Sequence, residues 1–150
     1  MKRCFFIGHS DAGIEILCDL IASIKRHITE YGVLEFVVGN YGGFDRLAAY
    51  AVKTVKEDYP NIKLTLLLPY HPSEHPVLLS EGFDGSLYPS YMERVPKRLA
   101  IIRANKYMVE HSDYLIAYSF YPGSNSQEIL EYAKSREKKG LIAVDNLYKK

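Results

Sequence analysis

The 150-residue sequence lacks a surplus of charge of either sign. Nineteen Lys and Arg side chains stand against eighteen Asp and Glu side chains, so the formal net charge at pH 7 is only +1. A nearly neutral chain has no global field that would attract nucleic acid or an anionic membrane, although a local basic patch is compatible with it. The composition therefore disfavours nucleic acid as a partner.

Cysteine and long apolar stretches are equally scarce. Cys4 and Cys18 form neither a CxxC motif nor a metal-ligand spacing, and the apolar segments around them predict that both are reduced and buried. No apolar run approaches the roughly 18 residues that a membrane span needs, so no membrane association is expected. Because no targeting segment is apparent either, a cytoplasmic location is expected.

The familiar phosphate-binding and metal-binding fingerprints are also missing. Residues 8–13 fit neither the GxGxxG spacing of dinucleotide-binding proteins nor the GxxxxGK[ST] spacing of P-loop enzymes. His71 and His75 are four residues apart, but Pro72 and Pro76 prevent the regular helix that would put them on one face. We therefore predict no metal site and no resident cofactor.

What the sequence does contain is a regular alternation of strand and helix patterns. Continuous apolar runs predict five strands, at residues 4–7, 34–38, 62–68, 114–118 and 141–144. Continuous rather than alternating apolarity indicates burial on both faces, hence a parallel sheet. Apolar stripes at helical spacing predict four crossover helices, at residues 17–28, 44–55, 96–109 and 126–138. The pattern predicts a single three-layer α/β Rossmann-like domain over residues 1–150, with a parallel sheet of about five strands.

One segment interrupts this rhythm. Residues 70–95 form a loop far longer than the usual few residues, rich in Pro and Gly and containing Phe83, Tyr88 and Tyr91. Two interpretations stay open. The loop is either a lid over a ligand site or a flap that packs on the domain or on a second subunit, so a homo-oligomer is compatible with the sequence.

In folds of this class, ligands bind beyond the carboxyl ends of the strands, so the loops that follow the strands supply the candidate site residues. After the first strand, Gly8 allows a close backbone approach, and Ser10 or Asp11 can cap the next helix. His9 is either a hydrogen-bonded turn residue or a ligand contact. After the second strand, glycines and exposed amides favour an anion, in the segment that contains Gly39, Asn40, Gly42 and Gly43.

Residues from three further places in the sequence extend this candidate site. Asp45 begins the second helix, where it either satisfies the helix dipole or binds a ribose hydroxyl and orders the neighbouring loop. Before the last helix, free amides and hydroxyls suit a phosphate, although a capping pattern of Ser124 with Gln127 or Asn125 with Glu128 explains the same residues. This third group comprises Gly123, Ser124, Asn125 and Ser126. Asn105, predicted on the apolar face of the third helix, ties down a loop or contacts the ligand.

These segments resemble the SLOG superfamily, which is named for the DNA-processing protein DprA (Smf) and the Lonely Guy phosphoribohydrolases, and most closely its small YpsA-like members. The resemblance rests on CFFIGH at residues 4–9, VGNYGGFD at 38–45, LPY at 68–70 and RANKYMVEHSD at 103–113. The sequence departs from the family pattern before and within the last helix, where Ser124-Asn125-Ser126 stands in place of Gly-Gly-Thr and Ile129 stands where Lonely Guy enzymes have a catalytic glutamate. Their catalytic arginine position likewise falls on Ala104, beside Arg103.

The resemblance implies a Rossmann-like fold that holds a nucleotide or nucleotide derivative, as a sensor or regulatory module. An alternative is a nucleotide N-glycosidic hydrolase, for which Asp45, Arg103 and Glu128 are the candidate catalytic residues. Single-stranded DNA binding, as in the DprA branch, is a third possibility that the neutral charge disfavours.

Overall fold

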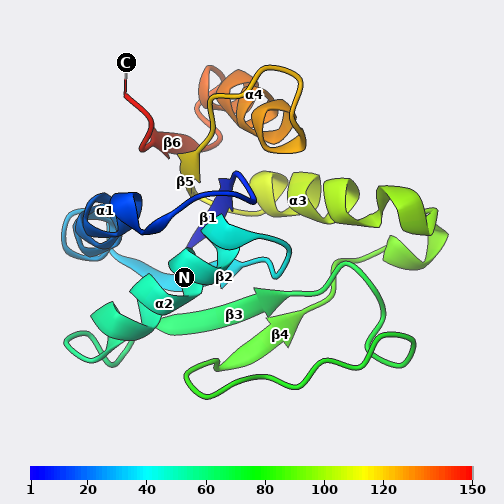
Figure 1. Ribbon diagram of the computed structural model, residues 1–150, viewed down its shortest axis with the longest axis horizontal. Coiled ribbons are helices and arrows are strands. Elements are labelled where there is room, and N and C mark those ends of the chain that lie inside the picture. The colour runs from blue at the N-terminus through cyan, green and yellow to red at the C-terminus, as the bar shows by residue number, and fades with distance from the viewer. Residues whose placement is uncertain (150) are drawn as a thin grey trace.

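The computed structural model describes residues 1–149 and centres on a sheet of six strands, all parallel (Figure 1). The strands are β1 (Lys2–Gly8), β2 (Val33–Val38), β3 (Lys63–Leu67), β4 (Gly85–Leu87), β5 (Tyr114–Tyr118) and β6 (Ala143–Asn146). Their spatial order is β4-β3-β2-β1-β5-β6. The predicted parallel α/β sheet is confirmed, with one strand more than expected.

Helices cover both faces of the sheet (Figure 1). They are α1 (Leu17–Thr29), α2 (Gly43–Lys56), α3 (Ala100–Glu110) and α4 (Asn125–Glu137). Side chains of α1 and α2 share one apolar core with Cys4 and Phe6, while α3 and α4 share the other with Phe5 and Ile7. Successive residues of a strand point to opposite faces, so β1 serves both cores and the predicted three layers are confirmed.

The starts of α1 and α3 differ from the sequence prediction. A 3-10 turn, Ile14–Ile16, precedes α1, whose N-cap is Ile16 without a side-chain cap, so the prediction that Ser10 or Asp11 caps this helix was wrong. Pro96 precedes another 3-10 turn, Lys97–Leu99, before α3 begins. A further short turn, Met92–Arg94, lies in the long loop.

Only one of the two cysteines is buried. Cys4 lies in the core on β1, as predicted, and burial raises the pKa of its thiol well above the usual value. Cys18 is exposed, which corrects the prediction. It occupies the second position of α1, and the apolar stripe that faces the core from this helix runs through Leu20 and Ile24 instead.

The extra strand, β4, lies inside the long loop. Its pairing is prepared by Asp84, whose amide donates to the carbonyl of Leu64 at 2.8 Å and whose Oδ2 accepts from the Leu64 amide at 2.8 Å. A residue that pairs twice with one partner aligns the chain for the ladder that follows. The long loop therefore supplies the edge strand of the sheet next to β3.

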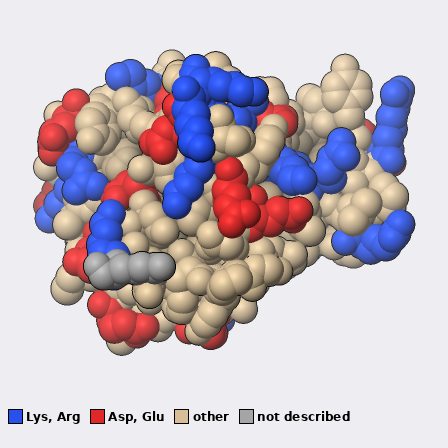
Figure 2. All heavy atoms as spheres, turned by 90° about the horizontal axis from the view of Figure 1, so that it is seen from above, with Lys and Arg blue, Asp and Glu red and all other residues tan. Residues whose placement is uncertain are grey.

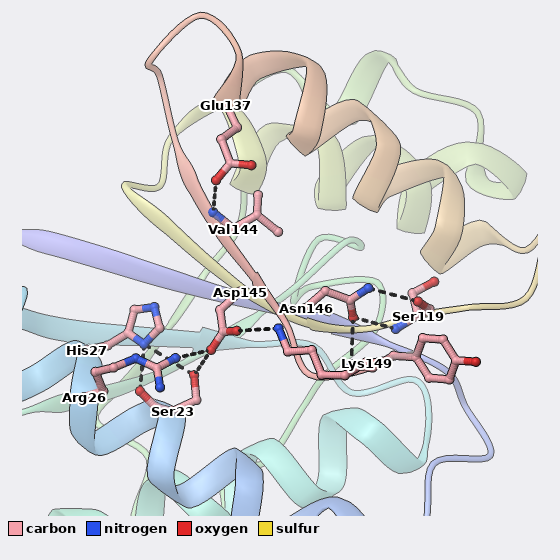
Figure 3. Close-up of polar contacts among 10 residues, drawn as sticks. Ser23, Arg26, His27, Ser119, Glu137, Val144, Asp145, Asn146 and Lys149 are labelled. Carbon is pink, nitrogen blue, oxygen red and sulfur yellow. Dashed lines mark hydrogen bonds and ion pairs between the residues drawn. The ribbon is translucent and has the colours of Figure 1, made fainter.

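The opposite margin of the sheet is the outer edge of β6. The Val144 amide, which points away from β5, donates to Oε2 of Glu137 at 2.8 Å (Figure 3). Further along, the Tyr148 amide donates to Oδ1 of Asn146 at 3.3 Å. Side chains thus bind one outward donor of β6, at Val144, and the Tyr148 amide just beyond the strand. Within residues 1–149, no helix is both long and apolar enough to cross a membrane.

Candidate functional site

A cavity of about 360 Å³ lies at the carboxyl edge of the sheet. The chain runs outward from β1 to β4 on one side and then returns to β5 on the other, so the loops after β1 and β5 diverge. This point of reversal is where ligands bind in open α/β sheets. Ile7, Leu67, Pro69, Ile101 and Ala104 form the apolar part of the lining.

The cavity brings together most of the predicted site residues, although they come from four separate parts of the chain. They are Gly8, His9, Ser10, Gly39, Gly42, Asp45, Asn105, Ser124, Asn125 and Ser126. A volume of this size lies within the range of small-molecule sites.

His9 is buried at the end of β1, with 4% of its surface exposed. Its Nε2 accepts hydrogen bonds from the amides of Phe120 at 2.8 Å and Tyr121 at 3.2 Å, and its Nδ1 lies 2.9 Å from Oγ of Ser126. Burial lowers the pKa of this imidazole below 6.5, an effect that the nearby Asp11 carboxylate opposes. His9 is therefore a hydrogen-bonded turn residue as well as part of the cavity wall.

The first turn of α4 supplies donors to the cavity. Oγ of Ser124 accepts from the Gln127 amide at 3.2 Å, which confirms Ser124 as the N-cap. Gln127 does not complete a capping box, because its Oε1 accepts from Oγ of Ser119. Among residues 1–149, the amides of Asn125 and Ser126 have no acceptor, and both residues line the cavity. Two free amides at a helix start favour an anion.

In the glycine turn before α2, several amides are engaged within the protein, while the Gly42 amide has no acceptor among residues 1–149. The Gly43 amide donates to the Ser10 carbonyl at 2.7 Å, and the Phe44 amide donates to the His9 carbonyl at 3.3 Å. A Cβ on Gly42 or Gly43 would lie within 2.8 Å of atoms in the loop after β1. These glycines allow two protein segments to pack, and the Gly43 amide is directed to Ser10 rather than to an anion, which corrects the prediction for this residue.

Gly8, which lines the cavity, also serves packing. A Cβ at this position would lie 2.3 Å from the ring of Phe44. The Phe44 side chain is 1% exposed and forms part of the core beneath the cavity. The first turn of α2 therefore sits directly on the end of β1.

Asp45 lies on the wall of the cavity, in the first turn of α2. Its Oδ2 accepts from the Tyr41 amide at 3.0 Å, so the carboxylate orders the glycine turn, as one of the two interpretations held. Burial raises the pKa of Asp45 from 3.8 to about 6, although the Tyr41 amide and then Arg46 favour its ionised form. A carboxyl group that titrates near neutral pH in a cavity is typical of functional sites.

Several predicted residues lie elsewhere. Arg103 is exposed and lines a different hollow beside Tyr107 and His111, on the side of α3 away from the cavity. Glu128 is exposed on α4, and Asn40 lines a hollow formed by α2 and the long loop. Gly123 adopts a φ of 76°, a left-handed conformation that favours glycine, and shapes the turn before α4.

Asn105 is only partly buried, which corrects its predicted place within the apolar face of α3. It lines the cavity, and within residues 1–149 no hydrogen bond ties its side chain to the glycine turn. Its amide group is therefore available to a ligand.

The sequence prediction missed the residues that hold the turn after β5. Asn146 at the end of β6 pairs with Ser119: its Oδ1 accepts from the Ser119 amide at 3.3 Å, and its Nδ2 donates to the Ser119 carbonyl at 3.2 Å (Figure 3). Tyr41 was missed as a lining residue. An aligned pair such as Asn146 and Ser119, 27 residues apart, has no signature in local sequence spacing.

No protein-family model matches the chain, and a search of curated proteins finds no significant match. Within residues 1–149, no three His, Cys, Asp or Glu side chains cluster closely enough to hold a metal ion.

Proposed function

We propose that the cavity binds a nucleotide or nucleotide derivative and that the protein acts as a sensor or regulatory module. The observation that carries this proposal is the pair of free amides, at Asn125 and Ser126, that opens on a cavity whose lining also includes Asp45. Amide donors at a helix start suit a phosphate, and a carboxylate suits the hydroxyl groups of a ribose. Membership of the SLOG superfamily forms part of the same proposal, on the segments at 38–45 and 103–113.

Binding without turnover accounts best for where the charged residues lie. A hydrolase of the expected type needs a cation for the phosphate and a second carboxylate, but Arg103 and Glu128 do not line the cavity. One observation favours the hydrolase: the raised pKa of Asp45 suits a group that donates or accepts a proton near neutral pH. Release of free base from nucleoside monophosphates would establish that activity.

Single-stranded DNA is a weaker candidate. On the face above α4 and β6, Lys and Arg side chains are interspersed with Asp and Glu, rather than gathered into one basic surface (Figure 2). Strong binding to a nucleic acid backbone depends on a concentration of positive charge.

The proposal predicts that Asn125→Pro weakens the binding of nucleoside monophosphates about tenfold, because one charge-assisted amide hydrogen bond is lost. Proline is tolerated at the first position of a helix, and Ser124 before it is extended, with φ −77° and ψ 158°, as a residue preceding proline requires. The substitution therefore removes a donor while preserving α4.

Asn125→Ala is the matched control, since it removes the same side chain and keeps the amide. Both variants would be titrated with a panel of nucleoside monophosphates by calorimetry, after native mass spectrometry of the purified protein has shown whether a nucleotide is retained. Equal affinities for the two variants would exclude the Asn125 amide from the site. A panel that does not bind to the wild-type protein would contradict the proposed function.

A further inference from the structure

The turn that leads from β5 into α4, residues 119–121, is held by side chains at the carboxyl ends of two different strands. His9 at the end of β1 accepts from the amides of Phe120 and Tyr121. Asn146 at the end of β6 pairs with both backbone groups of Ser119 (Figure 3). All three backbone amides of the turn therefore depend on two side chains that are remote in the sequence.

The hydrogen bonds of His9 indicate which nitrogen of the neutral ring carries the proton. Because Nε2 accepts from two amides, it carries no proton, so the proton of the neutral ring is on Nδ1. Nδ1 then donates to Oγ of Ser126 at 2.9 Å. The Ser126 hydroxyl accepts this bond and keeps its own hydrogen for another acceptor. In this state the start of α4 presents the cavity with donors.

We propose that His9 is a pH-sensitive positioning residue that aims the start of α4 at the anion, holding it when the ring is neutral and releasing it when the ring is protonated. Protonated Nε2 cannot accept from Phe120 and Tyr121, so the turn must move. Asn146 does not titrate and holds the other end of the turn at every pH. This inference rests on the proposed anion site.

The expected change in anion affinity with pH is opposite to the change that the charge of His9 alone would cause. A positive charge on His9 would by itself attract an anion, so affinity would rise in acid. The titratable groups around the ring are Asp11 on its own loop and Tyr118 and Tyr121 of β5 and the turn, while α4 presents Ser126 and α2 presents Asp45 across the cavity. Neutral Asp45 at low pH would also favour an anion. A loss of affinity in acid therefore points to a structural change.

Sulfate is the appropriate probe, because its charge does not change between pH 5.0 and 7.5, and its binding can be followed at the Asn125 and Ser126 amides by NMR. His9→Gln is the informative variant, since its side-chain oxygen can accept from the turn and does not titrate. Asp45 is present in both proteins, so the comparison between them isolates the contribution of His9. We expect the ratio of the sulfate dissociation constant at pH 5.0 to that at pH 7.5 to be about tenfold larger for the wild type than for His9→Gln.

Asn146→Ala separates positioning from general loss of structure. It is expected to weaken sulfate binding by a similar factor at both pH values and to leave the pH dependence of the wild type in place. In the wild-type protein, the amide signals of Phe120 and Tyr121 are expected to shift with the titration of the His9 ring even without sulfate.

The experiment distinguishes a failure of the His9 proposal from a failure of the anion site. Sulfate binding at Asn125 and Ser126 with the same pH profile in wild type and His9→Gln would overturn the role of His9 and leave the anion site standing. Failure of sulfate to shift these amides at pH 7.5 would remove the anion site, and the role of His9 with it.

Discussion

Replacing Gly43 with alanine is expected to lower the free energy of unfolding by about 3 kcal/mol. The added Cβ would lie 2.6 Å from the Ser10 carbonyl oxygen and 2.8 Å from the Ala12 carbonyl oxygen. Both are main-chain atoms, so no side chain can rotate away to relieve the overlap. The two segments would have to separate, which also breaks the 2.7 Å hydrogen bond from the Gly43 amide to Ser10.

Urea denaturation of the two proteins measures this difference. Gly85→Ala in β4 is the matched control, because among the described residues nothing lies within 4 Å of a Cβ placed there. That control should change stability by less than about 0.5 kcal/mol. If Gly43→Ala matched the control, the contact between the loop after β1 and the start of α2 would not be as close as the structure shows.

Asp45→Asn is expected to stabilise the folded protein at pH 7.5, by up to about 3 kcal/mol. This figure corresponds to a rise in the pKa of the carboxyl from 3.8 to about 6, caused first by its burial. At pH 7.5 the carboxyl group of wild-type Asp45 is ionised, although its buried position disfavours a charge. Asparagine removes the charge and keeps an oxygen for the Tyr41 amide, which now donates to Asp45 at 3.0 Å.

The raised pKa of Asp45 also predicts how the effect of Asp45→Asn on stability changes with pH. Between pH 3.8 and about 6, folded Asp45 holds a proton that the unfolded chain has released, so the contribution of this group to wild-type stability falls as the pH rises through that window. The advantage of Asp45→Asn should therefore be nearly absent at pH 4 and complete above about pH 6.5. Denaturation at both pH values tests this, with the exposed Asp58→Asn as the control. An equal advantage at the two pH values would contradict it.

The same substitution should weaken ligand binding if Asp45 meets a hydroxyl group of the ligand. A variant that is more stable than the wild type and binds less has lost function for reasons other than unfolding. Such a trade between stability and activity is expected where a buried charge is retained for binding. Asp45→Asn thus separates a ligand role for the carboxylate from its contact with Tyr41.

The main strands were predictable because continuous apolarity reflects burial on both faces, as at residues 114–118, which the structure reproduces as β5. β4 was not predictable, since its three residues carry no apolar run and its pairing depends on Asp84 meeting Leu64 across the sheet. The last strand begins at Ala143 rather than 141, because the chain is still turning at Gly140, which has a φ of 75°.

The site was predictable in position but not in detail. Ligand loops at the carboxyl ends of parallel strands follow from the fold class, and the cavity contains His9, Asp45 and Ser126. A sequence cannot show which partner a glycine approaches, so Gly43 was assigned to a ligand although it accommodates the loop after β1, and Gly42 both accommodates that loop and lines the cavity. Arg103 was assigned to the site for a similar reason. Tertiary packing determines which side of α3 faces the cavity, and the sequence does not show that side.

The two margins of the sheet limit how copies of this protein can associate. At β6 the outward amide of Val144 is already bound by Glu137, and at the other margin β4 is only three residues long. An incoming strand at β6 would have to displace the Glu137 side chain before it could pair fully, and at β4 it would find few backbone groups to pair with. Ladder growth from chain to chain, the first step toward fibrils, is thereby discouraged at both ends by the fold itself.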